Sequence, residues 1–364
     1  MNGIGKTGKK RSFWFTITHT KSMTAEEYKS TINKVITTVA LVFIVSAFVF
    51  IGIAIFGGIG QVVSTILHSN LYLYALAFAS VFLGYLVSFG KWAYFMRKLH
   101  VKVPLKKNLA VYLSLYSMDL TPGKIGRVVT AYTMSRIAKI KVFNVLPIVA
   151  MDTVTDFLGA AIVALAAAIY FNQFLWIVVV ADLVSIFPAF FVINDWFFRI
   201  LQKAFKKSSY LDMITMYGEE YFSSQSKLNK PRVYLVSLMF TIPSAILYSL
   251  ALYFVIMAVT QVPHIGAVAP PPLGHTVLIY YTAQVVGSMT SLPGNIGVTD
   301  GVLVATLNSV LGFNNYTSSA ITIMTRIATL WFGVLIGGAF LLYTFRYWNP
   351  TKRELRRFRK NRNR

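Results

Sequence analysis

The hexapeptides TPGKIG at residues 121–126 and LPGNIG at residues 292–297 interrupt two long apolar stretches, at about 105–138 and about 276–312. Both hexapeptides contain the pattern Pro-Gly-x-Ile-Gly. Proline removes a backbone hydrogen-bond donor and glycine relaxes the helix, so each hexapeptide should end one helix and begin another. We therefore predict two hairpins, each made of a helix broken near its middle.

Outside these hairpins the sequence contains further apolar runs. A helix needs about 20 apolar residues to cross the hydrocarbon core of a bilayer. Asp182 and Pro188 interrupt the fourth run, which makes it the weakest. Only 13% of the residues are charged, against about 25% in an ordinary soluble domain. We predict an all-α polytopic membrane protein with two re-entrant hairpins and six spanning helices, at about 35–60, 70–90, 143–171, 175–193, 233–260 and 318–345.

The basic residues are confined to the flanks of the apolar runs. The chain carries 35 Lys and Arg and a net charge of +23, but none of these residues lies in 35–90, 142–198 or 233–325. This pattern follows the positive-inside rule. It places both termini and the linker 194–232 in the cytoplasm. We expect the membrane to be the plasma membrane.

The basic segments at the two ends of the chain are expected to bind an anionic partner. The basic segments 1–34 and 346–364 flank the membrane domain 35–345. Nucleic acid is the alternative ligand for the tail at 352–364, and we do not expect it to bind there. Anionic lipid headgroups are favoured, because clusters of this kind commonly lie beside the membrane surface.

The two hairpins differ in the charge at their ends. The first has Lys106 and Lys107 before it and Lys139 and Lys141 after it, whereas the second has no basic residue at either end. They should therefore enter the membrane from opposite sides.

Each hairpin lies between two spans, in units at about 70–171 and about 233–345. Inverted repeats with broken helices are typical of secondary transporters. The alternative is that Pro-Gly marks two unrelated loops.

Three charged residues lie inside predicted spans of the repeats. Asp152 and Asp156 are four residues apart and share one face of a helix. Arg326 occupies the place in the second repeat that corresponds to Asp156. Charges inside a membrane are costly and commonly line a functional cavity. We predict an ion pair between Asp156 and Arg326 that lines and gates a cavity. The alternative is a purely structural salt bridge.

An anion site is predicted at the first break. Arg127 lies in the first turn of the helix that follows it, where free N–H groups and the helix dipole already favour an anion. Arg127 and Arg326 are therefore candidate ligands of a lipid phosphate. The glycines of the two breaks would let the backbone approach that ligand closely: Gly123, Gly126, Gly294 and Gly297.

Three other charged residues near the breaks are secondary candidates. Lys124 is expected to extend to the membrane interface rather than to contact the ligand. Arg136 lies nine residues after Arg127, on the opposite side of a regular helix. Asp300 is expected to cap the helix that begins after the second break.

No catalytic pattern is present. The chain has no Cys and only five scattered His, and it lacks the HExxH, GxSxG and Walker motifs. Asp152 and Asp156 could belong to a metal-dependent phosphotransferase, but too few acidic residues accompany them. We expect neither an enzyme, nor a metal site, nor a cofactor.

Four segments together resemble the lysylphosphatidylglycerol synthase transmembrane family, a flippase-like membrane domain, and the resemblance extends over about 35–345. This chain has Asp152-Thr153 where the family usually has Glu-Arg, and Asp300 where it usually has Glu. The similarity lies in TPGKIGRVVTAYTMSR (121–136), VAMDTVTDFLGA (149–160), SLPGNIGVTDGVLVATLNSVLGF (291–313) and TRIATLWFGVLIGG (325–338).

The resemblance implies a protein that flips a lipid with an anionic or sugar-bearing headgroup. Substrates in the family are thought to range from aminoacylated phosphatidylglycerol to polyprenyl-phosphate sugars. The soluble aminoacyl-transferase domain is expected to be absent, because 19 residues follow position 345. Two alternatives stay open: a membrane enzyme acting on lipid phosphates, and a scaffold that recruits a glycosyltransferase through the linker 194–232.

Overall fold

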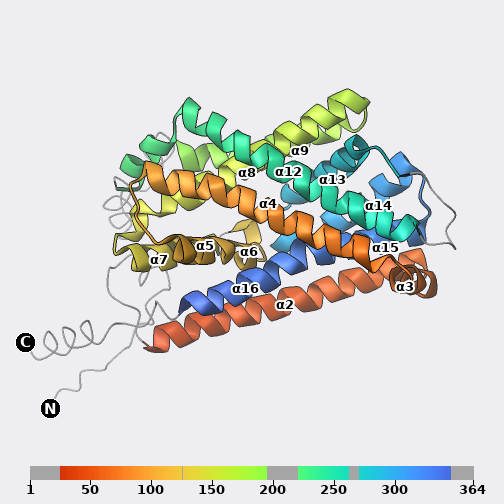
Figure 1. Ribbon diagram of the computed structural model, residues 1–364, viewed down its shortest axis with the longest axis horizontal. Coiled ribbons are helices and arrows are strands. Elements are labelled where there is room, and N and C mark those ends of the chain that lie inside the picture. Colours follow the sequence, from red (N-terminus) through yellow and green to blue (C-terminus); the bar gives the residue numbers. More distant parts are fainter. Residues whose placement is uncertain (1–24, 125, 195–219, 262–269, 346–364) are drawn as a thin grey trace, which may run out of the picture.

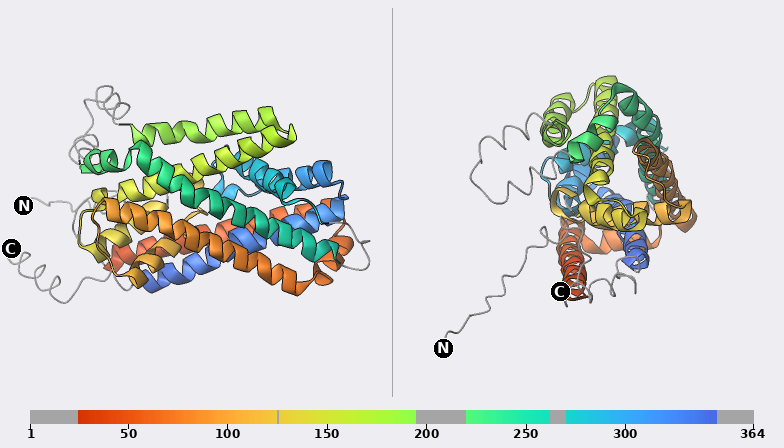
Figure 2. Two further views of the ribbon diagram at one scale, coloured as in Figure 1. Left: turned by 45° about the horizontal axis from the view of Figure 1, so that its top comes forward. Right: turned by 90° about the vertical axis from the view of Figure 1, so that its left-hand side faces the viewer.

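The computed structural model describes residues 25–124, 126–194, 220–261 and 270–345. Every regular element in these ranges is a helix, and most of the helices lie side by side along the long axis of the molecule (Figure 1). Figure 2 shows the same bundle from a second side and from one end. In the described part, five helical segments are long and apolar enough to cross a membrane: Ala40–Gly57, Leu71–Lys98, Val142–Phe171, Pro231–Thr260 and Asn315–Phe345.

The long helices follow the predicted spans, with four differences. The first helix, α2 (Ala25–Gly57), begins ten residues before the expected start at residue 35. Helix α4 (Leu71–Lys98) continues past the expected end at residue 90. The fourth predicted span forms α9 (Leu175–Ile193), whose apolar part Leu175–Phe187 is shorter than the other five. The last span is divided into α15 (Asn315–Arg326), a π-helical segment η4 (Ile327–Trp331) and α16 (Phe332–Phe345). The connector between the first two long helices and the remaining long helices are α3 (Ile59–Leu67), α8 (Leu146–Phe171) and α12 (Pro231–Thr260).

In both apolar stretches the helix ends at the Pro-Gly pattern and a new helix begins after it, which confirms the two breaks; that the hairpins re-enter the membrane stays a prediction. The first contains α5, α6, η1 and α7, and the second contains α13, η3 and α14. In Figure 1 the first hairpin lies toward the left end of the molecule and the second toward the right end. The bounds are α5 (Leu105–Leu113), α6 (Leu115–Met118), η1 (Pro122–Lys124), α7 (Arg127–Ala138), α13 (Leu273–Ser288), η3 (Pro293–Asn295) and α14 (Val298–Leu311).

The tips of the two hairpins, residues 119–124 and 291–295, touch each other near the middle of the bundle. The N–H of Gly123 donates to the carbonyl of Ser291 at 3.1 Å, and the N–H of Gly294 donates to the carbonyl of Asp119 at 3.2 Å. We call these two reciprocal hydrogen bonds the tip contact. Gly123 and Gly294 have φ of 56° and 60°, a left-handed conformation that glycine adopts readily. The two breaks are therefore one joined structure rather than unrelated loops.

The helices around the tips hold the hairpins in place. Helices α4 and α12 pack against each other, while α8 contacts α9, α12 and α13. Helix α16 packs on α5 and α6, and α2 packs on α15. Large apolar side chains are exposed on α2 and α9, including Phe48 and Trp176, as expected of surfaces that meet lipid. The polar groups described next therefore lie inside an apolar shell.

Candidate functional site

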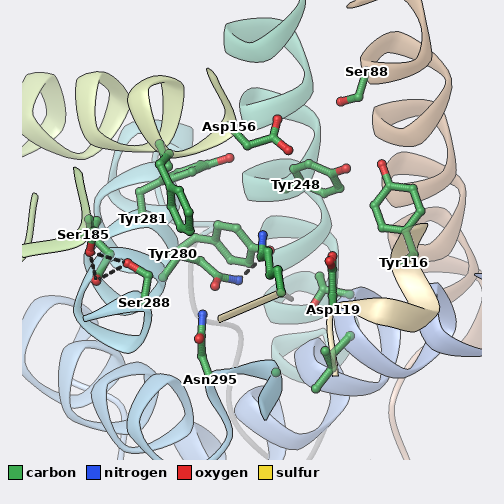
Figure 3. A pocket seen from close by; sticks show the side chains of 18 of the residues that line it. Ser88, Tyr116, Asp119, Asp156, Ser185, Tyr248, Tyr280, Tyr281, Ser288 and Asn295 are labelled. Carbon is green, nitrogen blue, oxygen red and sulfur yellow. Dashed lines mark hydrogen bonds between the residues drawn. The ribbon is translucent and has the colours of Figure 1, made fainter. Parts of the chain in front are cut away.

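A cavity of about 240 Å³ lies where the two tips meet. Its wall is built from α4, α8, α9, α12, α13, both tips and the junction between α15 and η4. Figure 3 shows side chains from several of these elements around one space. Tyr116, Tyr248, Tyr280 and Tyr281 form an aromatic part of the wall. The charged residues in the wall are Asp119, Lys124, Arg127, Asp156 and Arg326.

Lys91 is the buried cation that neutralises the two carboxylates of α8. Its Nζ contacts Asp156 Oδ1, lies 3.2 Å from Asp152 Oδ1, and donates to the Asp152 backbone carbonyl at 3.1 Å. The Lys91 side chain is 0% exposed, and that of Asp156 is 33% exposed. Two carboxylates at this helical spacing repel each other, so the lysine stabilises both in their charged form.

Arg127 joins the first tip to the same two carboxylates. Its Nε and Nη2 donate to the two oxygens of Asp119 at 2.7 Å and 3.0 Å, the paired geometry that arginine and carboxylate favour. Its Nη1 donates to Thr153 Oγ1 at 3.1 Å and lies 3.4 Å from Asp152 Oδ2. Arg127 borders the cavity as predicted, but its guanidinium is held by carboxylates and is not free for a phosphate. We call Lys91, Asp119, Arg127, Asp152 and Asp156 the charge cluster.

Lys124 lies in the cavity wall beside the charge cluster. Its Nζ is 5.2 Å from the centre of the Phe157 ring, a cation–π contact. In the described part of the chain it forms no ion pair and no hydrogen bond with another side chain. The expectation that Lys124 extends to the membrane interface was wrong, because its ammonium is directed over a ring that also borders the cavity.

Arg326 pairs with a carboxylate of its own repeat. Its Nε lies 2.9 Å from Asp300 Oδ1, and its Nη2 donates to the carbonyl of Gly294 at 2.6 Å. Asp300 also accepts from the N–H of Gly297 at 2.7 Å, which confirms it as the cap of α14. The predicted ion pair between Asp156 and Arg326 does not form: both residues border the cavity, but Lys91 and Arg127 already pair with Asp156.

The other candidates lie behind or beside the cavity wall. Gly123 and Gly294 border the cavity, whereas Gly126 and Gly297 lie behind the tips. Asp152 is buried behind Asp156 rather than in the wall. Arg136 is in the last turn of α7 and Asp182 is buried on α9, and neither borders the cavity.

Two members of the charge cluster were not identified from the sequence. Ending the second predicted span at residue 90, eight residues before the end of α4, places Lys91 in a basic flank, although GKWAYF (90–95) continues the apolar pattern. Asp119 lies three residues before Pro122, a position suited to pairing with Arg127 across the break. The aromatic part of the cavity wall also has a weak sequence signal, because its four tyrosines lie on three helices that are far apart in the sequence: α6, α12 and α13.

The comparisons with known proteins concern the whole membrane domain. A search of curated proteins finds no match to the chain. The sequence model of a family described as the lysylphosphatidylglycerol synthase TM region matches residues 37–337, which include both hairpins and the whole cavity wall. By this match, the chain belongs to the lysylphosphatidylglycerol synthase TM region family.

Proposed function

We propose that the protein transports a lipid with an anionic, phosphate-bearing headgroup across the plasma membrane. The headgroup would occupy the cavity between the tips, and the acyl or prenyl chains would stay in the bilayer. Membership of a family linked to lipid handling supports this proposal. The observation that carries it is Lys124, whose ammonium has no carboxylate partner among the described residues and lies in the wall of a polar cavity enclosed by apolar helices.

The phosphate is best accommodated between Lys124 and Arg326. Arg326 uses Nε and Nη2 for Asp300 and Gly294, and within the described part of the chain its Nη1 has no hydrogen-bond acceptor and can serve a ligand. Both residues border the same cavity, together with the amides of Asn295 and Gln284. Arginine and lysine are the usual phosphate ligands in proteins. Arg127 then has a positioning role, because it ties the first tip to α8.

The tip contact is a feature that transport could use. A transporter must open its central site to one side of the membrane and then to the other, and inverted repeats do this by moving one unit against the other. Only two backbone hydrogen bonds form the tip contact. The basic residues that flank the first hairpin would lie on the cytoplasmic side, so the second hairpin would enter from outside.

Reconstituted vesicles test the proposal. Fluorescent phosphatidylglycerol is placed in both leaflets, and a membrane-impermeant reductant bleaches only the outer leaflet, so that extra bleaching measures transport. We expect transport by the wild type and a strong loss for Lys124→Ala. Lys98→Ala is the matched control, because Lys98 also lies over an aromatic ring, 5.6 Å from the centre of Tyr94, but outside the cavity.

The same vesicles distinguish the alternative functions. Chemical conversion of the lipid, followed by chromatography, would indicate an enzyme. Neither transport nor conversion of phosphatidylglycerol or of a polyprenyl-phosphate sugar would favour a scaffold for a glycosyltransferase. The linker 194–232 proposed for that role lies largely outside the described residues.

A further inference from the structure

We propose that Asp156 takes up one proton when a lipid phosphodiester binds in the cavity, so that the lipid and the proton are carried together. This inference rests on the proposed function. The proton would come from water and bond to a carboxylate oxygen that faces the cavity, which converts the carboxylate into a neutral acid. The phosphodiester adds one negative charge and the proton removes one, so the loaded cavity keeps its net charge.

The charges that the described residues place around the cavity are balanced without a ligand. On the side of the first repeat, three carboxylates face three bases: Asp119, Asp152 and Asp156 against Lys91, Lys124 and Arg127. On the side of the second repeat, Asp300 faces Arg326. An added phosphodiester would leave one uncompensated negative charge inside an apolar shell, where unpaired charges are strongly unfavourable. One proton restores the balance.

Asp156 is the carboxylate best placed to receive this proton. Its side chain is 33% exposed, against 19% for Asp119 and 3% for Asp152. Asp119 is fixed by two hydrogen bonds from Arg127. Asp152 does not border the cavity. The two oxygens of Asp156 differ: Oδ1 contacts Lys91, whereas Oδ2 is 3.8 Å from Arg127 and is the weaker held of the two.

The groups that face Asp156 explain why the proton should arrive only with the ligand. Lys91 on α4 and Arg127 on α7 keep Asp156 ionised in the empty cavity. Asp152 on its own helix opposes ionisation, and Tyr248 on α12 and Tyr281 on α13 are neutral phenols in the same wall. A bound phosphodiester adds a second anion and competes for the nearby Lys124. Both effects disfavour the ionised carboxylate.

The test measures protons taken up per lipid bound. Dioctanoyl phosphatidylglycerol is titrated into the purified full-length protein by calorimetry, at one pH, in ACES and in imidazole buffers, whose ionisation enthalpies differ. We expect about one proton per lipid for the wild type. We also expect affinity to fall with rising pH, up to about tenfold per pH unit, the limit for one proton. Binding without proton uptake would overturn the inference.

Variants assign the proton to a residue. Asp156→Asn copies the neutral acid, so it should bind the lipid at least as tightly as the wild type, without proton uptake and without pH dependence. Glu220→Gln removes a carboxylate that pairs with Lys141 outside the cavity and should keep the uptake. Uptake that persists in Asp156→Asn, or that disappears only in Asp182→Asn, would overturn the assignment. If Asp156→Asn does not fold, the number of protons that the wild type takes up per lipid still tests whether lipid and proton bind together.

A second probe separates this inference from the proposed function. Glycerophosphoglycerol carries the same phosphodiester without acyl chains. Weaker binding of this probe than of the lipid, with one proton taken up by each, supports both proposals. Equal or tighter binding of the soluble probe with one proton would contradict lipid transport and leave the proton site standing. Absence of binding by both probes would overturn both.

Discussion

The two hairpin tips have the same backbone but different chemistry. Both break at Pro-Gly-x-Ile-Gly, both place the glycine in a left-handed conformation, and each donates one hydrogen bond to the other. Aligned on their prolines, Lys124 of the first tip corresponds to Asn295 of the second, and Arg127 corresponds to Val298. The scaffold is therefore close to symmetric, while the charged groups come mainly from the first repeat.

This asymmetry separates the basic residues that pair with carboxylates from Lys124, which has no carboxylate partner among the described residues around the cavity. Lys91, Arg127 and Arg326 each pair with at least one buried carboxylate, whereas Lys124 contacts an aromatic ring. A base that compensates a buried carboxylate stabilises the fold. A base without such a partner adds less to stability than a paired base does, and it is available for an anion. The following predictions test this division, beginning with the largest effect.

Removing the cation at the centre of the charge cluster should have the largest effect on stability. Lys91→Met leaves Asp152 and Asp156 without their shared partner, and breaking a buried pair in this way costs about 3–5 kcal/mol. Unfolding of the detergent-solubilised protein by denaturant measures the loss. Lys98→Met, at the exposed end of the same helix, should change stability by less than about 0.5 kcal/mol. Equal losses for the two variants would contradict a structural role for Lys91.

Double-mutant cycles can distinguish the ion pair between Arg326 and Asp300 from the pair that was predicted between Arg326 and Asp156. A double-mutant cycle with Arg326→Gln and Asp300→Asn should give a coupling energy of about 1–3 kcal/mol, as for residues in direct contact. A cycle with Arg326→Gln and Asp156→Asn should give less than about 0.5 kcal/mol, as for separate pairs. A larger coupling energy in the second cycle than in the first would indicate that Arg326 pairs with Asp156 after all.

Replacing either glycine of the tip contact with alanine should lower stability, by different amounts at the two positions. Gly123→Ala and Gly294→Ala each place a side chain in a left-handed conformation, which costs roughly 1–2 kcal/mol. Gly294→Ala should cost more, because its Cβ would lie 3.2 Å from Leu120 and Leu330, whereas that of Gly123 meets nothing within 4 Å. Gly338→Ala, with open space around it, is the control, and denaturant unfolding ranks the three. A larger loss of stability for Gly123→Ala than for Gly294→Ala would argue against the close contact of Gly294 with Leu120 and Leu330.

Removing the Lys124 ammonium from the first tip, and placing a lysine at the corresponding position of the second tip, should have the smallest effect on stability. Lys124→Asn should lower stability by less than Lys91→Met does, because Lys124 forms no ion pair in the described part of the chain, and should abolish binding of dioctanoyl phosphatidylglycerol. Adding Asn295→Lys should restore part of that binding, because Asn295 borders the same cavity and has φ of 55°, against 58° for Lys124. Calorimetry compares the two variants. Unchanged binding in Lys124→Asn would show that Lys124 is not a ligand.

The sequence predicts the helix breaks well because Pro-Gly acts locally. It also predicts that Asp300 caps α14, since capping depends on a few neighbouring residues. It does not predict ion pairs, because these depend on distances between helices. Asp156 and Arg326 occupy corresponding places in the two repeats, yet correspondence does not require contact. Lys91 was missed because a lysine at the end of an apolar run looks the same whether it is solvated or buried.

The central claim is that a lipid phosphate lies between Lys124 and Arg326 while Arg127 stays paired with Asp119. The most direct measurement is a cryo-electron microscopy structure of the protein with a bound antibody fragment, in nanodiscs of phosphatidylglycerol. The account predicts phosphate density between the Lys124 ammonium and the Arg326 guanidinium, with the pair of Arg127 and Asp119 unbroken. Phosphate density on Arg127 with that pair broken, or a cavity without phosphate, would contradict it.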